Sequence, residues 1–470
     1  MKNLRNILFY IIVIGSFSIL IYAIVCAGET LQTGRDIVTN ASEKTVFQEF
    51  VGSILDNLRH SIGLLLLQML IVIVAARLFG WLFKKIGQPS VIGEIFAGIL
   101  LGPSLLGTCA PDVSQFVFPA VSLTNLNILS QIGLILFMFV VGMELNLKAL
   151  RNNIHEAVVV SHASIIIPFT LGVGLTWFVY PILAPEHVKF SSFALFMGIS
   201  MSITAFPVLA RIVQERGIQK TKLGATVITC AAADDITAWC LLAVVIAIVK
   251  AGTFVSALYT ILFAVSFVLF MLKILRPFLR KIVKRYHSES DKKNLVVLFF
   301  IILILSAFFT ESIGIHALFG AFMAGVIMPD NMNLRKMFVD KIEDISQVLF
   351  LPLFFVISGL RTQIGLLNDW QLWKITAIII LCAIIGKFVG SAFAAKFVGQ
   401  NWRDSLSIGA LMNTRGLMEL VVLNIGYDLG VLGTEMFTMM VIMALVTTFM
   451  TGPSLNLIER LGKKKNTESQ

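Results

Sequence analysis

The sequence predicts an all-α polytopic membrane protein, and two observations support this prediction. Of the 470 residues, 57% are apolar and only 14% are charged, whereas an ordinary soluble domain has about 25% charged residues. The apolar residues also gather into long runs, and about 20 such residues suffice to span a bilayer as a helix. We therefore expect a dozen or more membrane spans and no soluble domain of any size.

Windows of about 19 residues divide the chain into fourteen apolar segments. They lie near residues 6–27, 61–83, 90–107, 126–146, 157–183, 190–212, 223–248, 252–275, 294–311, 314–329, 346–366, 372–398, 405–427 and 434–458. The first segment is interpreted as a retained anchor helix, because its apolar run exceeds the roughly 7 to 15 residues typical of a signal peptide. Residues 1–60 then comprise this anchor, or signal, and an extracytoplasmic loop.

The basic residues orient the spans, since short cytoplasmic loops carry the excess of Lys and Arg. A cytoplasmic N-terminus places most of the 37 basic residues inside, including Lys84, Lys85 and the cluster from Lys273 to Lys293. It also places the basic tail, residues 461–470, in the cytoplasm. The net charge of +10 is thus interpreted as a topology signal, and no nucleic-acid partner is expected.

The last thirteen segments divide into six spans, one linking span at 252–275 and six more spans. An odd number of spans separates corresponding halves, so the repeat is expected to be inverted. Polar interruptions fall at equivalent places in the two halves, G-I-S-M-S-I-T from Gly198 to Thr204 and G-A-L-M-N-T-R from Gly409 to Arg415. Such interrupted helices in inverted halves indicate the midplane substrate site of a secondary transporter.

Two adjacent acidic residues, Asp234 and Asp235, lie almost at the centre of the seventh segment. Each charge there costs about 2.5 to 3.5 kcal/mol on insertion scales. Neighbouring residues on a helix point about 100° apart, so one carboxylate can face a cavity while the other faces a neighbouring helix. The pair therefore predicts an ion site within the membrane.

A single lysine, Lys387, lies near the middle of the segment at 372–398. At about 1.5 Å per residue it is roughly 16 Å from either end of the span, too far for its side chain to reach water. It therefore needs a buried anion at its own depth. Asp234 and Asp235 are both candidates.

The stretch S-M-S-I-T-A-F-P in the sixth segment places Pro207 inside a predicted helix. Its ring would clash with the carbonyl of Ile203 and release that carbonyl from the helix. Together with the hydroxyls of Ser202 and Thr204, the free carbonyl offers hard oxygen ligands for a small cation. Proline kinks without function are also common in membrane helices, so this motif alone does not distinguish a cation site from an ordinary kink.

Arg415 and Glu419 lie four residues apart in N-T-R-G-L-M-E-L. At this spacing the two side chains can pair on one helix face. We interpret them as a structural ion pair, for which Glu94 is a competing partner of Arg415.

Five stretches resemble sequences of the bacterial cation:proton antiporter-2 family, whose members have a sodium/proton exchanger domain. They are G-E-I-F-A-G-I-L-L-G-P-S, L-F-M-F-V-V-G-M-E-L, I-T-A-F-P-V-L-A-R, A-A-A-D-D and N-T-R-G-L-M-E-L. The resemblance covers about residues 61–458. It implies a thirteen-helix sodium/proton antiporter fold with inverted repeats and crossed broken helices, to which this chain adds one N-terminal helix.

The resemblance also implies a division of residues 61–460 into two domains and a homodimer. The core, or transport, spans are expected at about 157–248 and 372–458. The dimerisation spans are expected at about 61–146 and 294–366, and the span at 252–275 is the linker.

The resemblance assigns roles to the buried charges. Asp235 falls at the main cation- and proton-binding carboxylate, and Asp234 at the aspartate that pairs with a core lysine, here Lys387. Thr204 falls at the broken-helix threonine near the cation, so Asp235 and Thr204 are the expected ligands of transported Na⁺ or K⁺. The acidic pair implies electrogenic exchange, whereas potassium-efflux relatives often carry Gln-Asp there.

The expected function is therefore exchange of a monovalent cation, sodium in the first place, for protons across a bacterial inner membrane by alternating access. A potassium/proton antiporter of the same fold and a cation channel are the alternatives. An intramembrane aspartyl protease needs carboxylates from two helices, so no enzymatic activity is expected. The chain lacks a G-x-x-x-x-G-K-[ST] motif, so we expect no nucleotide partner. Membrane lipid is the expected partner, with no cofactor besides the transported ions.

Overall fold

The computed structural model describes residues 2–29, 46–144, 154–219, 221–251, 254–285, 289–329 and 342–467. The regular structure of these residues is entirely helical, as the sequence predicts. They form two compact units, residues 1–60 and 61–470. The last residues of the predicted basic tail, 468–470, lie outside the described ranges.

The first unit contains α1 (Lys2–Glu29) and α2 (Val46–Arg59). Within α1, Phe9–Gly28 is long and apolar enough to cross a membrane, which confirms the first apolar segment as a helix. The second helix was not predicted, because α2 lies in the stretch interpreted as a loop. Its apolar residues recur every three to four positions, and a 19-residue average hides such a one-sided pattern.

The second unit begins with α3 (Ser61–Lys85), α4 (Ser90–Leu101), α5 (Leu106–Cys109), α6 (Pro111–Val117), α7 (Ala120–Glu144), α8 (Ile154–Leu183), α9 (Phe190–Ser202), α10 (Phe206–Glu215) and α11 (Lys222–Ala251). The middle part is α12 (Phe254–Phe270), η3 (Met271–Leu275), α13 (Arg276–Arg285), α14 (Glu289–Ser312), α15 (Ala317–Val326), η4 (Ser346–Phe350), α17 (Leu351–Leu360) and η5 (Ile364–Leu366). The last part is α18 (Trp370–Ile384), η6 (Ile385–Val389), α19 (Gly390–Phe397), α20 (Trp402–Met412), α21 (Leu417–Asp428) and α22 (Thr434–Thr467).

The described helices account for every predicted span. Twelve helical stretches, α1 among them, are long and apolar enough to cross a membrane, and the shorter α9 and α15 are apolar as well. Each of the thirteen segments predicted after residue 60 therefore coincides with helix. The helix at the linking span is longer than predicted, since η3 and α13 continue it to Arg285. Leu279 and Val283 are buried in α13 among basic residues that lower the window average.

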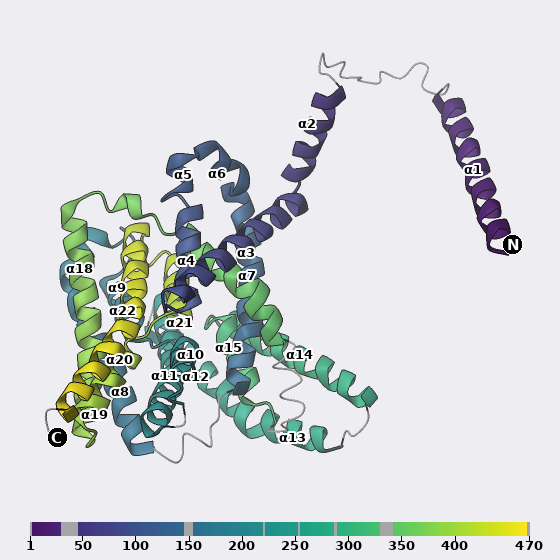
Figure 1. The fold of residues 1–470 in the computed structure, drawn as a ribbon. Coiled ribbons are helices and arrows are strands. Elements are labelled where there is room, and N and C mark those ends of the chain that lie inside the picture. Colours follow the sequence, from purple (N-terminus) through teal and green to yellow (C-terminus); the bar gives the residue numbers. More distant parts are fainter. Residues whose placement is uncertain are drawn as a thin grey trace. The chain divides into compact units, whose positions relative to one another are not determined.

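Two spans are broken into consecutive short helices (Figure 1). The chain is extended between α9 and α10, with ψ of 139° at Ile203 and 90° at Ala205. Pro207 lies in the first turn of α10, where a proline is well tolerated. The expectation of a proline kink inside a continuous helix is therefore wrong, because the helix has already ended at Ser202. The second break separates α20 from α21.

The two breaks cross each other. The amide of Ala205 donates to the carbonyl of Thr414 over 3.1 Å, and the hydroxyl of Thr204 lies 3.4 Å from the carbonyl of Met412. Backbone groups that leave one helix thus find partners at the other break, which makes such breaks tolerable inside a membrane. The predicted crossed broken helices are confirmed.

The helices of the second unit pack in two groups (Figure 1). The α4–α17 group consists of α3, α4, α7, α14, α15 and α17, and the α9–α21 group consists of α8 to α11 and α18 to α22. In the first group, a Cβ at Gly98 of α4 would lie 2.3 Å from the carbonyl oxygen of Val356 in α17. This backbone contact leaves no room for a side chain. The predicted dimerisation and transport roles of the two parts stay predictions.

The span that carries Lys387 contains a π-helical turn. In η6 the amide of Gly390 donates to the carbonyl of Ile385, five residues earlier. This turn joins α18 to α19 without a break and widens the helix by one residue. It lies against α8 and α20, where it places Lys387 in the interior.

Candidate functional site

A hydrogen-bonded cluster of fully buried polar side chains forms around Asp234 of α11. Its Oδ2 atom accepts hydrogen bonds of 2.7 Å from both Ser164 Oγ and Thr204 Oγ1. Lys387 Nζ lies 3.2 Å from the same oxygen. The ammonium group also donates to Ser164 Oγ over 2.7 Å and to the Thr204 hydroxyl. Three elements, α8, the α9–α10 break and η6, thus converge on one carboxylate.

The charge of Lys387 is balanced by Asp234. Both side chains are 0% exposed, and a buried charge that loses its partner destabilises a protein strongly. The residues alone left both aspartates as candidates for this role. The structure selects Asp234, in agreement with the assignment that the resemblance implied.

Asp235 has a different environment from its neighbour. It is 2% exposed, and within the described part of the chain neither carboxylate oxygen has a hydrogen-bond partner. The backbone amide of Phe206, in the first turn of α10, lies near this carboxylate but makes no hydrogen bond of normal geometry to it. Helix N-termini favour negative charge, so α10 supports an anion here while leaving its oxygens available to a ligand.

The other predicted ligands around the break differ in orientation. Ser202 Oγ donates to the carbonyl of Ile199 over 2.9 Å, so its hydroxyl is engaged in the last turn of α9. Ile203 is 1% exposed and lies in the extended segment, where its carbonyl leaves the helical ladder. The Thr204 hydroxyl is hydrogen-bonded to both Asp234 and Lys387. Its role as a cation ligand beside Asp235 stays a prediction.

The ion pair between Arg415 and Glu419 is present and has a second role. The two side chains lie 3.2 Å apart and are 0% exposed. The guanidinium group also donates to the carbonyls of Ser200 over 2.9 Å and Met201 over 2.7 Å. Arg415 therefore caps the C-terminus of α9, where a positive charge is favoured by the helix dipole. Glu94 lines a cavity between the helix groups.

Two residues of the site were missed by the sequence interpretation. Ser164, which bridges Lys387 and Asp234, is one of several serines in α8, and its position relative to α11 gave no signal in the sequence. Asn413 lies between Met412 and Thr414 at the helix crossing and is 1% exposed. Neither amide atom of its side chain has a partner among the residues described, which costs about 1–3 kcal/mol for a buried group. Asn413 is thus a further candidate for contact with a ligand.

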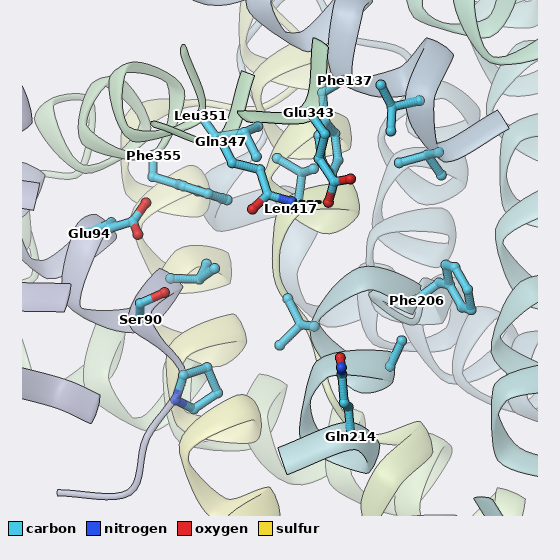
Figure 2. A pocket seen from close by; sticks show the side chains of 16 residues that line it. Ser90, Glu94, Phe137, Phe206, Gln214, Glu343, Gln347, Leu351, Phe355 and Leu417 are labelled. Carbon is cyan, nitrogen blue, oxygen red and sulfur yellow. Dashed lines mark hydrogen bonds between the residues drawn. The ribbon is translucent and has the colours of Figure 1, made fainter. Parts of the chain in front are cut away.

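A cavity of about 460 Å³ separates the two helix groups. Figure 2 shows its lining, with Glu94, Phe137 and Phe355 from the α4–α17 group and Phe206 and Leu417 from the α9–α21 group. Phe206 and Leu417 are the first residues of the helices that follow the two breaks. The cavity therefore reaches the first turns of the two helices that follow the breaks.

A buried carboxylate beside two crossed broken helices, with a lysine balancing its neighbour, defines a secondary transporter of ions. A family model described as "Sodium/hydrogen exchanger, transmembrane" matches residues 72–459. The chain belongs to this family and is a multi-pass membrane protein.

Named relatives agree with this membership. The chain is 45% identical over 396 residues to the Na(+)/H(+) antiporter NhaS4 of Synechocystis, covering 84% of this chain and 97% of that protein. It is 41% identical to Cation/H(+) antiporter 17 of Arabidopsis thaliana, covering 86% of this chain and 50% of the relative. For K(+)/H(+) antiporter 1 of Saccharomyces cerevisiae the identity is 33%, over 86% and 47% of the two chains. The chain thus spans about half the length of the plant and yeast relatives.

A solved structure confirms the predicted fold. The sodium proton antiporter MjNhaP1 from Methanocaldococcus jannaschii matches with a TM-score of 0.64, covering 85% of this chain and 98% of the other. At 14% identity this likeness concerns the fold alone.

Proposed function

We propose that this protein exchanges a monovalent cation, sodium in the first place, for protons by alternating access. One observation carries the proposal. Asp235 is a buried carboxylate with both oxygens unpartnered among the described residues, while the adjacent Asp234 is already paired with Lys387. Asp235 is therefore the carboxylate of the pair with both oxygens available to a transported ion, whereas Asp234 has only its Oδ1 atom unpartnered among the described residues.

Competition for Asp235 couples the two ions. A desolvated carboxylate can hold a proton or a cation, and each excludes the other. Linkage requires that protons weaken cation binding by the same factor by which the cation weakens proton binding. If only a loaded site crosses the barrier, every cation that leaves must be replaced by protons, and exchange follows without ATP.

The ligand set combines Asp235 with neutral oxygens at the helix crossing. The carbonyl of Ile203 and the side-chain oxygen of Asn413 are suitable hard ligands for a small cation. Thr204 acts chiefly as a positioning residue, since its hydroxyl is bonded to Asp234 and touches Lys387. No resident cofactor is needed, and no enzymatic reaction is proposed.

The cavity is assigned to the cytoplasmic side of a bacterial inner membrane. Gln214, near the end of α10, and Ser90, at the start of α4, both line it. Ser90 follows the turn after Lys84 and Lys85, and such basic loops stay in the cytoplasm. Both termini then lie in the cytoplasm as well. A homodimer through the α4–α17 group and contact with membrane lipid complete the proposal.

Sodium is the first candidate because the relative with 45% identity is named a Na(+)/H(+) antiporter. The yeast relative's name makes potassium the second candidate. Purified protein in liposomes with an internal pH dye, challenged in turn with sodium, lithium and potassium, tests both. Sodium-driven proton movement that saturates with concentration is expected. Cation flux without obligatory proton countermovement would instead identify a channel.

A further inference from the structure

A polar cluster joins the two helix groups at the ends of α17 and α21 that are remote from the cavity. Arg361, which follows α17, lies 2.9 Å from Asp428 of α21 and donates to Asn424 Oδ1 over 2.6 Å. The Asn424 amide in turn donates to Ser358 Oγ of α17 over 2.8 Å. The guanidinium carbon also lies 5.3 Å from the ring centre of Tyr427. One arginine of the first group thus contacts three residues of α21.

The cavity and this cluster lie at opposite ends of the same two helices. Leu351 and Leu417, the first residues of α17 and α21, line the cavity. Asp428 lies about 16 Å further along α21, at about 1.5 Å per residue. The groups are therefore apart at the cavity end and bonded at the remote end, as expected of a transporter open to one side.

Each partner in the cluster is firmly held within its own group. The chain after Arg361 is tied to the α4–α17 group, because Ser104 Oγ, in the turn after α4, donates to the carbonyl of Thr362 over 2.8 Å. The amide of Gln363 also reaches the other group, donating to Thr438 Oγ1 of α22 over 3.1 Å. The end of α21 is packed on α22, where the rings of Tyr427 and Phe437 lie 5.3 Å apart. A relative movement of the groups must therefore break the contacts of Arg361 with α21, together with the bond from Gln363 to α22.

The contacts of the cluster suit repeated opening. The side chains of Arg361 and Asp428 are 19% and 38% exposed, so water can replace each partner of this ion pair, and such pairs are weak. The bond from Asn424 to Ser358 is buried and must also break when the groups part. The backbone contact at Gly98 between α4 and α17, in contrast, leaves no room for a side chain. Bistable interfaces commonly exchange their salt bridges in this way.

We propose that Arg361, Asn424 and Asp428 form the outer gate of the transporter, which closes the extracytoplasmic side in this conformation and must open once per cycle. The proposal rests on the proposed alternating access. It assigns these residues to the change of conformation and gives them no part in ion binding.

A reversible cross-link tests the gate. The double variant Ser358→Cys with Asn424→Cys, cross-linked by a short reducible thiosulfonate linker, should lose exchange, and reduction should restore it. The matched control is a cysteine pair at positions 68 and 122, since Gln68 and Ser122 are bonded over 2.6 Å within the α4–α17 group. Its cross-link should leave exchange unchanged, and single-cysteine variants control for reaction at the native cysteines. Undiminished exchange after complete 358–424 cross-linking would overturn the gate.

A second measurement separates a gate from a merely structural contact. Ala210 lines the cavity, so an Ala210→Cys reporter should react with an impermeant thiol reagent from the cytoplasmic face. Adding Arg361→Ala should slow this labelling severalfold, because the outward-open population rises, and Arg361→Asp with Asp428→Arg should restore the rate. Labelling at the unaltered rate in a folded Arg361→Ala protein would contradict the proposal. Labelling does not require transport, so failure of sodium exchange itself would be recognised separately.

Discussion

Asp235 is the residue on which the proposed exchange depends most directly. Asp235→Asn keeps the shape of the side chain but removes the charge for which cation and proton compete, so exchange should fall to background. Proton flux in liposomes measures this loss. Asp112→Asn, at an exposed position of α6, is the matched control and should remain active. Full activity of Asp235→Asn would place the exchanged ions elsewhere.

Lys387 should contribute to stability as well as to transport. Lys387→Met leaves Asp234 buried without its cationic partner, and breaking a buried pair in this way costs about 3–5 kcal/mol. The melting temperature in detergent should fall clearly. Adding Asp234→Asn removes the uncompensated charge and should recover most of the loss. Equal melting temperatures of the two variants would argue that the pair is not coupled.

Thr204 joins the paired charges to the broken helix. Thr204→Val removes the hydroxyl that Asp234 and Lys387 share while preserving the shape of the side chain. We expect a raised apparent KM for the cation with a smaller effect on maximal rate, measured from initial rates over a range of sodium concentrations. Thr204→Ser retains the hydroxyl and should stay close to the unaltered protein. An unchanged KM in Thr204→Val would show that the Thr204 hydroxyl neither binds the cation nor positions the site for it.

At the scale of helices, we expect Arg415 to stabilise the protein by capping the C-terminus of α9. Arg415→Lys keeps a positive charge but cannot reach both carbonyls with the fixed geometry of a guanidinium group. Losing one buried hydrogen bond costs about 1–3 kcal/mol, so the protein should melt earlier. Arg403→Lys, on the exposed first turn of α20, provides the control. A melting temperature unaffected by Arg415→Lys would remove the capping role.

The positions of the membrane-spanning helices could be predicted from the sequence, because a bilayer demands long apolar stretches wherever the chain crosses it. The need of Lys387 for a buried anion also followed from its depth alone. The geometry of the first break did not, since the bond from Ala205 to Thr414 comes from a segment some two hundred residues away. For the same reason no local pattern indicated that Arg415 caps α9 or that Ser164 bridges the paired charges.

At the scale of the whole molecule, the buried triad predicts electrogenic exchange of two protons per cation. With a cation bound, Asp234 and Asp235 ionised and Lys387 neutral, the site carries one negative charge. With Asp235 and Lys387 protonated it carries none. The two crossings differ by one charge, so a potential of 100 mV contributes about 2.3 kcal/mol per cycle.

The prediction is tested by sodium-driven proton flux in liposomes whose potential is clamped with valinomycin and potassium. The rate should change with the imposed potential, once potassium has been shown not to be transported itself. Asp234 and Lys387 interact strongly and titrate as one unit, so the second proton belongs to the pair and not to either residue alone. A rate indifferent to the potential would mean one-for-one exchange and would exclude the two-proton mechanism.

The π-helical turn η6 makes this span sensitive to the deletion of a single residue. Deleting one residue from Ile385–Val389 would restore a regular α-helix and rotate all that follows by about 100°. Lys387 and α19 could then not both keep their places. The backbone of η6 packs closely on α20, where a Cβ at Gly409 would lie only 2.4 Å from the carbonyl oxygen of Phe388. In a deletion scan, single losses in the turn between α19 and α20 should be tolerated, whereas each of the five deletions within η6 should prevent assembly of the site.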